Sequence, residues 1–95
     1  MDIGSIRHKA LLVFAETGRT KGLPSNFVDR LRKMLVWLNA IDHESELFVP
    51  PNYGAHQLTG NRNGVWSLTV SRNWRMTFRI SETATIEDLD LEDYH

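Results

Sequence analysis

Residues 65–80 have the sequence VWSLTVSRNWRMTFRI, which is the strongest secondary-structure signal in the chain. Apolar and polar side chains alternate on both sides of a central Ser-Arg-Asn turn at residues 71–73. Alternation with a period of two is typical of strands that bury one face. The pattern therefore predicts two antiparallel strands, over residues 65–70 and 74–80, joined by a short turn.

The same alternation divides the predicted sheet into an apolar and a polar face. Arg75, Thr77 and Arg79 share the polar face, which we expect to be open and to carry arginine. A further strand is expected over residues 84–91, where Ile86 is the clearest apolar residue. Residues 1–6 are expected to form an edge strand.

Two helices are expected before the sheet. Residues 8–17 carry an apolar stripe, and Gly18 stands where a glycine commonly ends a helix. Residues 24–41 begin with Pro24, which the first turn of a helix tolerates, and repeat apolar side chains at three- and four-residue spacing. Residues 43–55 contain several helix and strand breakers and are expected to be a loop.

This order of elements predicts an α+β fold, in which two N-terminal helices pack on one face of an antiparallel β-sheet. The 95 residues are expected to form one domain, residues 1–95. No apolar run approaches the length of a membrane helix, and no secretory signal is visible. The absence of cysteine excludes disulfides, thiolate catalysis and Cys-based zinc sites, and fits a cytoplasmic location.

Charge is distributed unevenly although the formal net charge is only −1. The charged residues between positions 59 and 80 are all arginine, whereas those between 81 and 95 are all acidic. Concentrated arginine could bind phosphate. The two blocks could instead form ion pairs with each other on a sheet surface, and charge alone favours this second interpretation. Arg30, Arg32 and Lys33 lie off the apolar stripe of their helix and suggest a solvated or partner-facing surface.

A small set of residues has the chemistry that cleaves RNA. The reaction needs a base for the 2′-hydroxyl, an acid for the leaving 5′-oxygen and positive charge at the phosphate. His56 and His95 suit the proton transfers, Arg75 suits the phosphate, and Asp93 suits an orienting role. Simpler interpretations stand beside these: His56 capping a strand, His95 and Asp93 belonging to an inert acidic tail, and Tyr94 packing. No histidine pair has the spacing of a metal-binding helix motif.

Several motifs together resemble one protein family. Residues 56–70 (HQLTGNRNGVWSLTV), residues 71–79 with their Asn-Trp-Arg core, and the terminal Leu-Glu-Asp-Tyr-His of residues 91–95 look like the motifs of HigB-type toxins. Residues 8–11 and 14–18 are similar as well. The resemblance covers most of the chain in the family's order and spacing.

The resemblance implies a RelE-like fold and cleavage of messenger RNA in the ribosomal A site, with no metal and no cofactor. It implies a helix-turn-helix antitoxin (HigA-like) as partner and binding to operator DNA only through the antitoxin complex. The basic surface of the second expected helix could then face either an acidic antitoxin or ribosomal RNA.

The resemblance also assigns site residues. Carried over by position, the family's active-site residues fall on His56, Asp93, Tyr94 and His95. The positions at which the family contacts or stabilises the RNA phosphate are matched by Asn73 and Arg75. Further candidates for RNA binding are Arg62 and Arg79.

One departure from the family motif concerns the phosphate. The motif commonly reads His-Pro-Leu-Lys-Gly, whereas this chain has His-Gln-Leu-Thr-Gly at residues 56–60. Thr59 thus removes one positive charge, and the expectation is a weaker or differently tuned nuclease in which Arg62 or Arg79 partly compensates. Two alternatives use the same fold: a ParE-like inhibitor of DNA gyrase, and a degenerate module that only binds the antitoxin.

Overall fold

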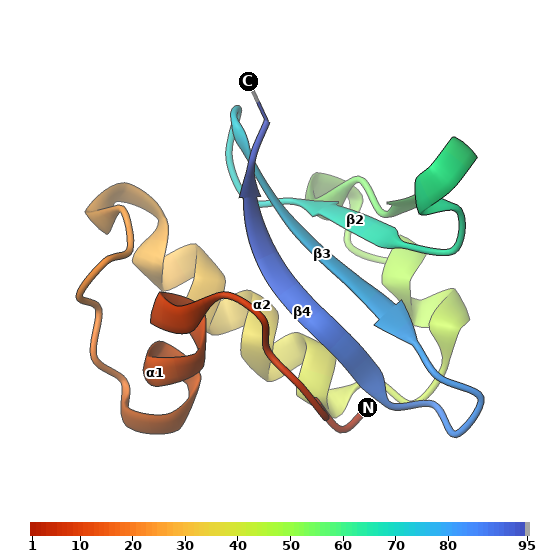
Figure 1. Cartoon of the computed structure of the whole chain (residues 1–95), viewed down its shortest axis with the longest axis horizontal. Helices are drawn as coiled ribbons and strands as arrows, with labels where there is room; N and C mark the ends of the chain where they lie inside the picture. Colours follow the sequence, from red (N-terminus) through yellow and green to blue (C-terminus); the bar gives the residue numbers. More distant parts are fainter. Residues whose placement is uncertain (95) are drawn as a thin grey trace.

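The computed structural model describes residues 1–94 and confirms the α+β architecture (Figure 1). Helix α1 spans Lys9–Thr17 and helix α2 spans Val28–Ala40. The strands that follow are β1 (His56–Gln57), β2 (Trp66–Thr69), β3 (Trp74–Ile80) and β4 (Ile86–Asp93). They form one antiparallel sheet in the order β1-β2-β3-β4, so each strand pairs with its neighbour in the chain.

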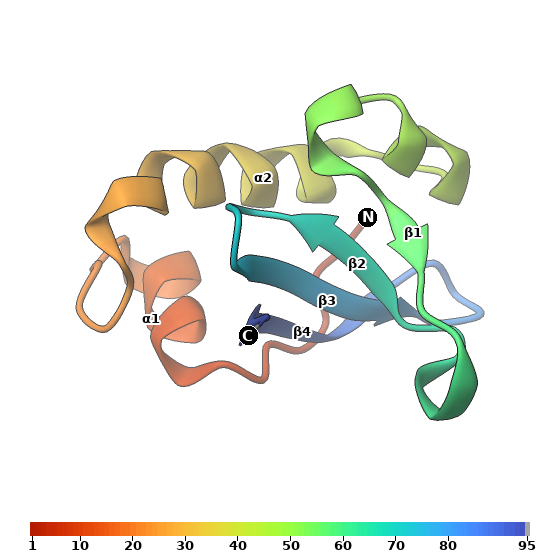
Figure 2. The same cartoon turned by 90° about the horizontal axis from the view of Figure 1, so that it is seen from above.

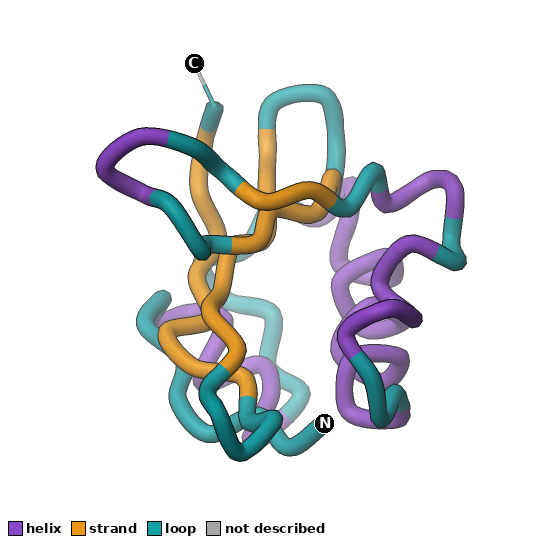
Figure 3. Tube along the Cα trace, turned by 90° about the vertical axis from the view of Figure 1, so that its right-hand side faces the viewer, coloured by secondary structure: helices purple, strands orange, loops and turns teal. Residues whose placement is uncertain are grey.

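Helix α2 lies along one face of the sheet, and α1 lies next to it on the side of the N-terminal segment (Figure 2). Seen from the side, α2 stands on one side of the strands (Figure 3). The core forms between these layers, because the apolar positions of the helices and the sheet meet there. Its fully buried side chains include Leu11, Leu31, Met34, Leu38, Leu68, Met76, Phe78, Ile86 and Leu89.

The helix ends follow from local sequence. The His8 ring accepts a hydrogen bond from the backbone N–H of Leu11, at 3.2 Å, and so caps α1. Gly18 ends the helix at φ 78°, a conformation that favours glycine. The expected start of the second helix at Pro24 is wrong: Ser25–Phe27 form a separate 3₁₀ turn, and α2 begins at Val28.

The N-terminal segment pairs with β4 in parallel, as expected for an edge strand, but only through bridges at Ile3 and Ile6. Between the two bridges β4 has a bulge, in which Asp88 adopts φ 55°. Strand β4 also runs to Asp93, beyond the expected end at residue 91. The expected loop at 43–55 contains two further 3₁₀ turns, Glu44–Phe48 and Pro51–Tyr53.

The polar face of the sheet is less open than expected. Ser67 and Thr77 are buried on it, with exposed fractions of 0% and 2%. A 3₁₀ turn at Gly60–Arg62 brings Arg62 against Glu92 on this face, and Glu92 accepts a hydrogen bond from Thr77. The polar face is therefore partly covered by its own ion pair. None of the helices within residues 1–94 has the length and hydropathy to cross a membrane.

Candidate active site on the polar face of the sheet

The strand register brings two of the predicted catalytic residues to the polar face. His56 lies opposite Ser67, and Ser67 lies opposite Thr77, so these side chains share a face. Arg75 lies two residues before Thr77 in β3, so its side chain is on the same face. From strand spacing and rise, the Cα atoms of His56 and Arg75 are about 12 Å apart, a span that their side chains and one phosphodiester can bridge.

His56 is exposed at the edge strand, and its ring is oriented by the backbone. Its Nδ1 lies 3.0 Å from the carbonyl oxygen of Gly54. Because a carbonyl oxygen only accepts hydrogen bonds, Nδ1 carries the proton, and in the neutral ring Nε2 has a free lone pair. This arrangement orients the ring and leaves Nε2 as a proton acceptor.

Arg75 is held at the start of β3 by the turn that precedes it. Its Nη1 donates to the carbonyl oxygens of Ser71 at 2.7 Å and Trp74 at 3.1 Å. Its guanidinium carbon lies 5.2 Å from the centre of the Tyr94 ring, whose face attracts the cation. Nη1 also donates to the carbonyl oxygen of Arg72 at 3.4 Å, so the guanidinium is oriented through this one nitrogen and can offer its Nη2 edge to a phosphate oxygen.

Tyr94 is held beside Arg75 by the backbone of the β2–β3 turn. It is half exposed, and its backbone N–H donates to the carbonyl oxygen of Asn73. Asn73 therefore fixes the end of the chain next to the turn through its main chain, while its own side chain is exposed.

Asp93 and His95 are placed differently from these residues. Asp93 lies opposite Trp74 in the sheet, so its side chain leaves the strand on the face of Trp74 and not on that of Arg75. His95 lies outside the described residues. The structure therefore brings His56, Arg75 and Tyr94 to one side of the sheet, and does not place Asp93 on the same face.

Glu92 is a residue of this face that sequence reasoning missed. Both of its carboxylate oxygens accept hydrogen bonds from the Arg62 guanidinium, at 2.9 and 2.6 Å, and Thr77 donates to one of them. These hydrogen bonds, above all those from Arg62, hold the pKa of Glu92 below its usual range. The only sequence signal was the opposition of an arginine block and an acidic block, and the pairing interpretation of that signal is confirmed for Arg62 and Glu92.

The candidate RNA-binding arginines differ in how far they are already engaged. Both line a small hollow of about 120 Å³ on the polar face. Arg62 uses two nitrogens on Glu92, and these hydrogen bonds raise the pKa of Arg62. Arg79 is exposed and donates from Nη1 to the carbonyl oxygen of Asn63 at 3.3 Å. Of the two, Arg79 has the weaker internal partner and is the better placed to bind a phosphate.

Comparison with known proteins bears on the family of this chain. Residues 4–95 match the family described as RelE-like toxin of type II toxin–antitoxin system HigB. A curated relative from Proteus vulgaris, named Endoribonuclease HigB, is 43% identical over 96 residues, which cover 98% of this chain and 99% of the relative. The chain belongs to the HigB-like toxin family.

Solved structures support the fold of this HigB-like toxin. YafQ from E. coli strain BL21(DE3) superposes with a TM-score of 0.54 and 14% identity, over 94% of this chain and 91% of that chain. A point mutant of YafQ from E. coli superposes with a TM-score of 0.52 at the same identity and coverage. Membership of a type II toxin–antitoxin family also implies an antitoxin partner.

The polar face of this HigB-like toxin can supply two of the functions that RNA cleavage needs. The Nε2 atom of His56 can accept a proton, and the Arg75 guanidinium can stabilise negative charge on a phosphate. Within residues 1–94, no group of three or more His, Asp or Glu side chains is arranged to hold a metal ion. On this face, the residue types of His56 and Arg75 are chemically suited to proton transfer and to phosphate binding.

Proposed function

We propose that this chain is an endoribonuclease that cleaves messenger RNA in the A site of the ribosome and thereby inhibits translation. The observation that carries the proposal is that His56, with a proton-accepting Nε2, shares one sheet face with Arg75. The name of the Proteus vulgaris relative supports the endoribonuclease activity. Dependence on the ribosome rests on the family resemblance.

In the proposed reaction, Nε2 of His56 takes the proton of a 2′-hydroxyl, and the 2′-oxygen attacks the adjacent phosphorus. The bond from phosphorus to the 5′-oxygen breaks, and that oxygen takes a proton from an acid, for which His95 is the candidate. The products are a 2′,3′-cyclic phosphate and a 5′-hydroxyl. Arg75 stabilises the charge that develops on the phosphate oxygens, with the Tyr94 ring against its guanidinium.

The remaining residues have supporting roles in the proposal. Asn73 positions Tyr94 through its carbonyl oxygen. Asp93 is the candidate for orienting His95. RNA phosphates outside the cleaved bond are bound by Arg79 and Arg62. The partners are the ribosome, a HigA-like antitoxin and, through the antitoxin complex, operator DNA, and the proposed location is accordingly the cytoplasm.

Primer extension on messages in a translating extract tests the proposal. The purified chain is compared with His56→Ala and His95→Ala, and with His43→Asn as a control at an exposed histidine outside the sheet. We expect cuts inside codons that require ribosomes, persist in His43→Asn and disappear in both alanine variants. The same message without ribosomes should remain intact.

Each other outcome changes the proposal. Cuts that persist in His95→Ala move the acid to another group, and cuts that persist in His56→Ala exclude His56 as the base. Cuts in the absence of ribosomes exclude ribosome dependence. If the parent chain makes no cuts, the nuclease is excluded, and inhibition of gyrase and binding of the antitoxin become the assays to make.

A further inference from the structure

Arg75 and Glu92 lie directly opposite each other on the polar face of the sheet. They are register partners in β3 and β4, so their side chains leave the sheet on the same face. The Cβ atoms of such partners lie about 4.5–5.5 Å apart, a spacing at which opposite charges attract each other. The register alone therefore predicts an ion pair between Arg75 and Glu92.

That ion pair does not form, although the structure describes both residues. The Arg75 guanidinium donates to backbone carbonyl oxygens of the turn before β3. The Glu92 carboxylate accepts instead from the Arg62 guanidinium, at 2.9 and 2.6 Å, and from the Thr77 hydroxyl. Glu92 is thus held by other partners than the arginine that it faces.

Arg62 reaches Glu92 across the sheet. It lies in the Gly60–Arg62 turn between β1 and β2, whereas Glu92 lies on β4, and β3 separates β2 from β4. Two parallel N–H···O bonds to one carboxylate fix its orientation as well as its position. The hydrogen bond from Thr77, two residues along β3 from Arg75, keeps the carboxylate beside Thr77. The side chain of Glu92 therefore leans along β3 and not straight across to Arg75.

An ion pair with Glu92 would interfere with the proposed role of Arg75. The Nη2 edge that Arg75 can offer to a phosphate is also the edge that a carboxylate can bind. A neighbouring carboxylate with no cation of its own would in addition repel the phosphate. Because Arg62 pairs with Glu92, the carboxylate charge is balanced and the Nη2 edge of Arg75 stays available.

Other cations near Glu92 are less suited to replace Arg62. Arg62 contributes most to the lowered pKa of Glu92, through its hydrogen bonds, and Arg7 contributes less. Arg79 shares the polar face but is the register partner of Glu87. If Arg62 is removed, the arginine directly across the strands from Glu92 is Arg75.

We propose that Arg62 is a positioning residue for Arg75: by binding Glu92 it keeps this carboxylate from pairing with Arg75, which stays open to the phosphate of the cleaved bond. The role acts through Glu92 and is separate from any phosphate that Arg62 itself binds. Its effect on cleavage rests on the proposed nuclease function. The exchange of partners on the sheet can be measured without RNA.

Primer extension on messages in a translating extract tests the effect on cleavage. Arg62→Ala should cleave at least about ten-fold more slowly than the parent, because Glu92 then pairs with Arg75. Arg62→Ala/Glu92→Gln should return to within about three-fold of the parent, because the glutamine has no charge with which to bind Arg75. The remaining loss is that of a phosphate contact made by Arg62 itself.

A charge-matched variant controls for this rescue. Arg62→Ala/Glu87→Gln has the same net charge as the rescued variant, and Glu87 is exposed on the same strand but faces Arg79. It should stay as slow as Arg62→Ala. Circular dichroism at the assay temperature checks that every variant is folded, so that a rescue of cleavage is not a rescue of folding.

An acid titration followed by NMR at the carboxyl carbon of Glu92 measures the exchange of partners without RNA. In Arg62→Ala we expect Arg75 to hold the pKa of Glu92 down, so Arg62→Ala/Arg75→Ala should titrate at a higher pH. Arg62→Ala/Arg72→Ala removes an exposed arginine of the neighbouring turn instead, and should titrate as Arg62→Ala does.

Several results would overturn the inference. Cleavage by Arg62→Ala/Glu92→Gln that is as slow as that of Arg62→Ala would show that Arg62 acts on RNA alone, and equal rescue by Glu87→Gln would show an effect of net charge. Parent-rate cleavage by Arg62→Ala, or equal titration of Glu92 with and without Arg75, would overturn it too. If the parent makes no cuts, the proposed nuclease fails, and the titration still decides whether Arg62 keeps Glu92 from Arg75.

Discussion

The turn before β3 orients the Arg75 guanidinium before any anion binds to it. Carbonyl oxygens of residues 71 and 74 and the ring of Tyr94 fix the guanidinium, so a phosphate does not have to order it. We expect Arg75→Ala to lower the rate of message cleavage about 100-fold, without loss of secondary structure. Arg72→Ala, at an exposed arginine of the same turn, is the control and should cleave at the parent rate.

Thr59 stands where the family motif commonly has a lysine, so this chain lacks one positive charge there. It is exposed and directly precedes the Gly60–Arg62 turn, whose arginine is occupied by Glu92. We expect Thr59→Lys to raise the cleavage rate about five-fold, because a further cation attracts the phosphate. Gln57→Lys adds the same charge on the face of β1 that His56 does not use, and should have no such effect. Equal rates in Thr59→Lys and the parent would show that the missing lysine is not limiting.

At the scale of the element, the turn between β3 and β4 contains a strained residue. Ala84 has φ 58°, a left-handed conformation that costs an alanine about 1–2 kcal/mol. Ala84→Gly should therefore raise the free energy of unfolding, by about 0.5–1 kcal/mol after the entropic cost of glycine is subtracted. Urea denaturation measures the change. Ala40→Gly, at the end of α2, is the control and should lower stability.

The attachment of the Gly60–Arg62 turn to β4 should depend on pH. The pKa of Glu92 is lower in the folded chain than in the unfolded chain, so its contribution to stability is present above the ordinary glutamate pKa and is lost as the pH falls through the folded value. At pH 7, Glu92→Gln should lower the free energy of unfolding by about 1 kcal/mol, a modest value because Arg62 is partly exposed.

Denaturation of the Glu92→Gln variant and the parent at about pH 7 and at low pH measures this dependence. The difference between them should shrink as the pH falls from the ordinary glutamate pKa through the lowered pKa of folded Glu92, because the parent carboxylate then takes up a proton. Glu87→Gln, at an exposed glutamate of the same strand, is the control and should differ little from the parent at either pH. A difference between Glu92→Gln and the parent that stays constant with pH would show that the Arg62–Glu92 ion pair does not stabilise the fold.

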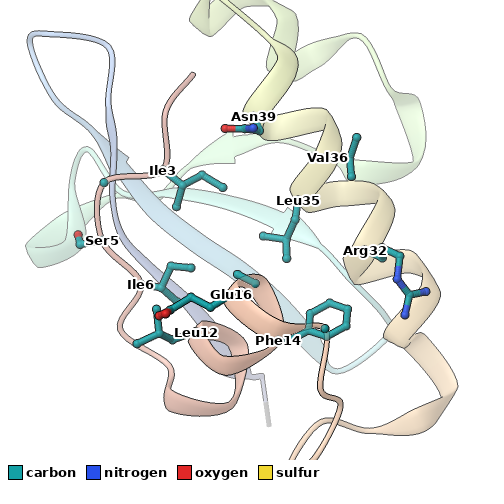
Figure 4. Close-up of a pocket in the computed structure, with 13 residues that line it drawn as sticks. Ile3, Ser5, Ile6, Leu12, Phe14, Glu16, Arg32, Leu35, Val36 and Asn39 are labelled. Carbon is teal, nitrogen blue, oxygen red and sulfur yellow. The ribbon is translucent and has the colours of Figure 1, made fainter.

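At the scale of the whole molecule, the candidate active site shares no residue with a groove of about 640 Å³ among the helices. The groove lies among the helices and the N-terminal segment (Figure 4), and the candidate active site lies on the polar face of the sheet. Val36→Glu, at an exposed residue that lines this groove, should therefore cleave messages at the parent rate. Primer extension on Val36→Glu and the parent measures this independence, and a loss of cleavage in the folded variant would contradict it.

Local pattern was enough to predict the α+β fold, both helices, the β2–β3 hairpin and the residues that share its faces. The reason is that alternation and helical spacing are properties of neighbouring residues, which backbone geometry converts directly into faces. Membership of the toxin family was indicated by motifs for the same reason, because they are local runs of sequence.

Contacts between distant residues required the tertiary structure. The pairing of Arg62 with Glu92 joins residues thirty positions apart, and the sequence showed only that two oppositely charged blocks exist. The bulge at Asp88, the opposite faces of Asp93 and Arg75, and the groove between α1 and α2 also depend on register and packing. Such features depend on which strands pair and which helices pack together. The free energy of these long-range contacts is not contained in any local sequence pattern.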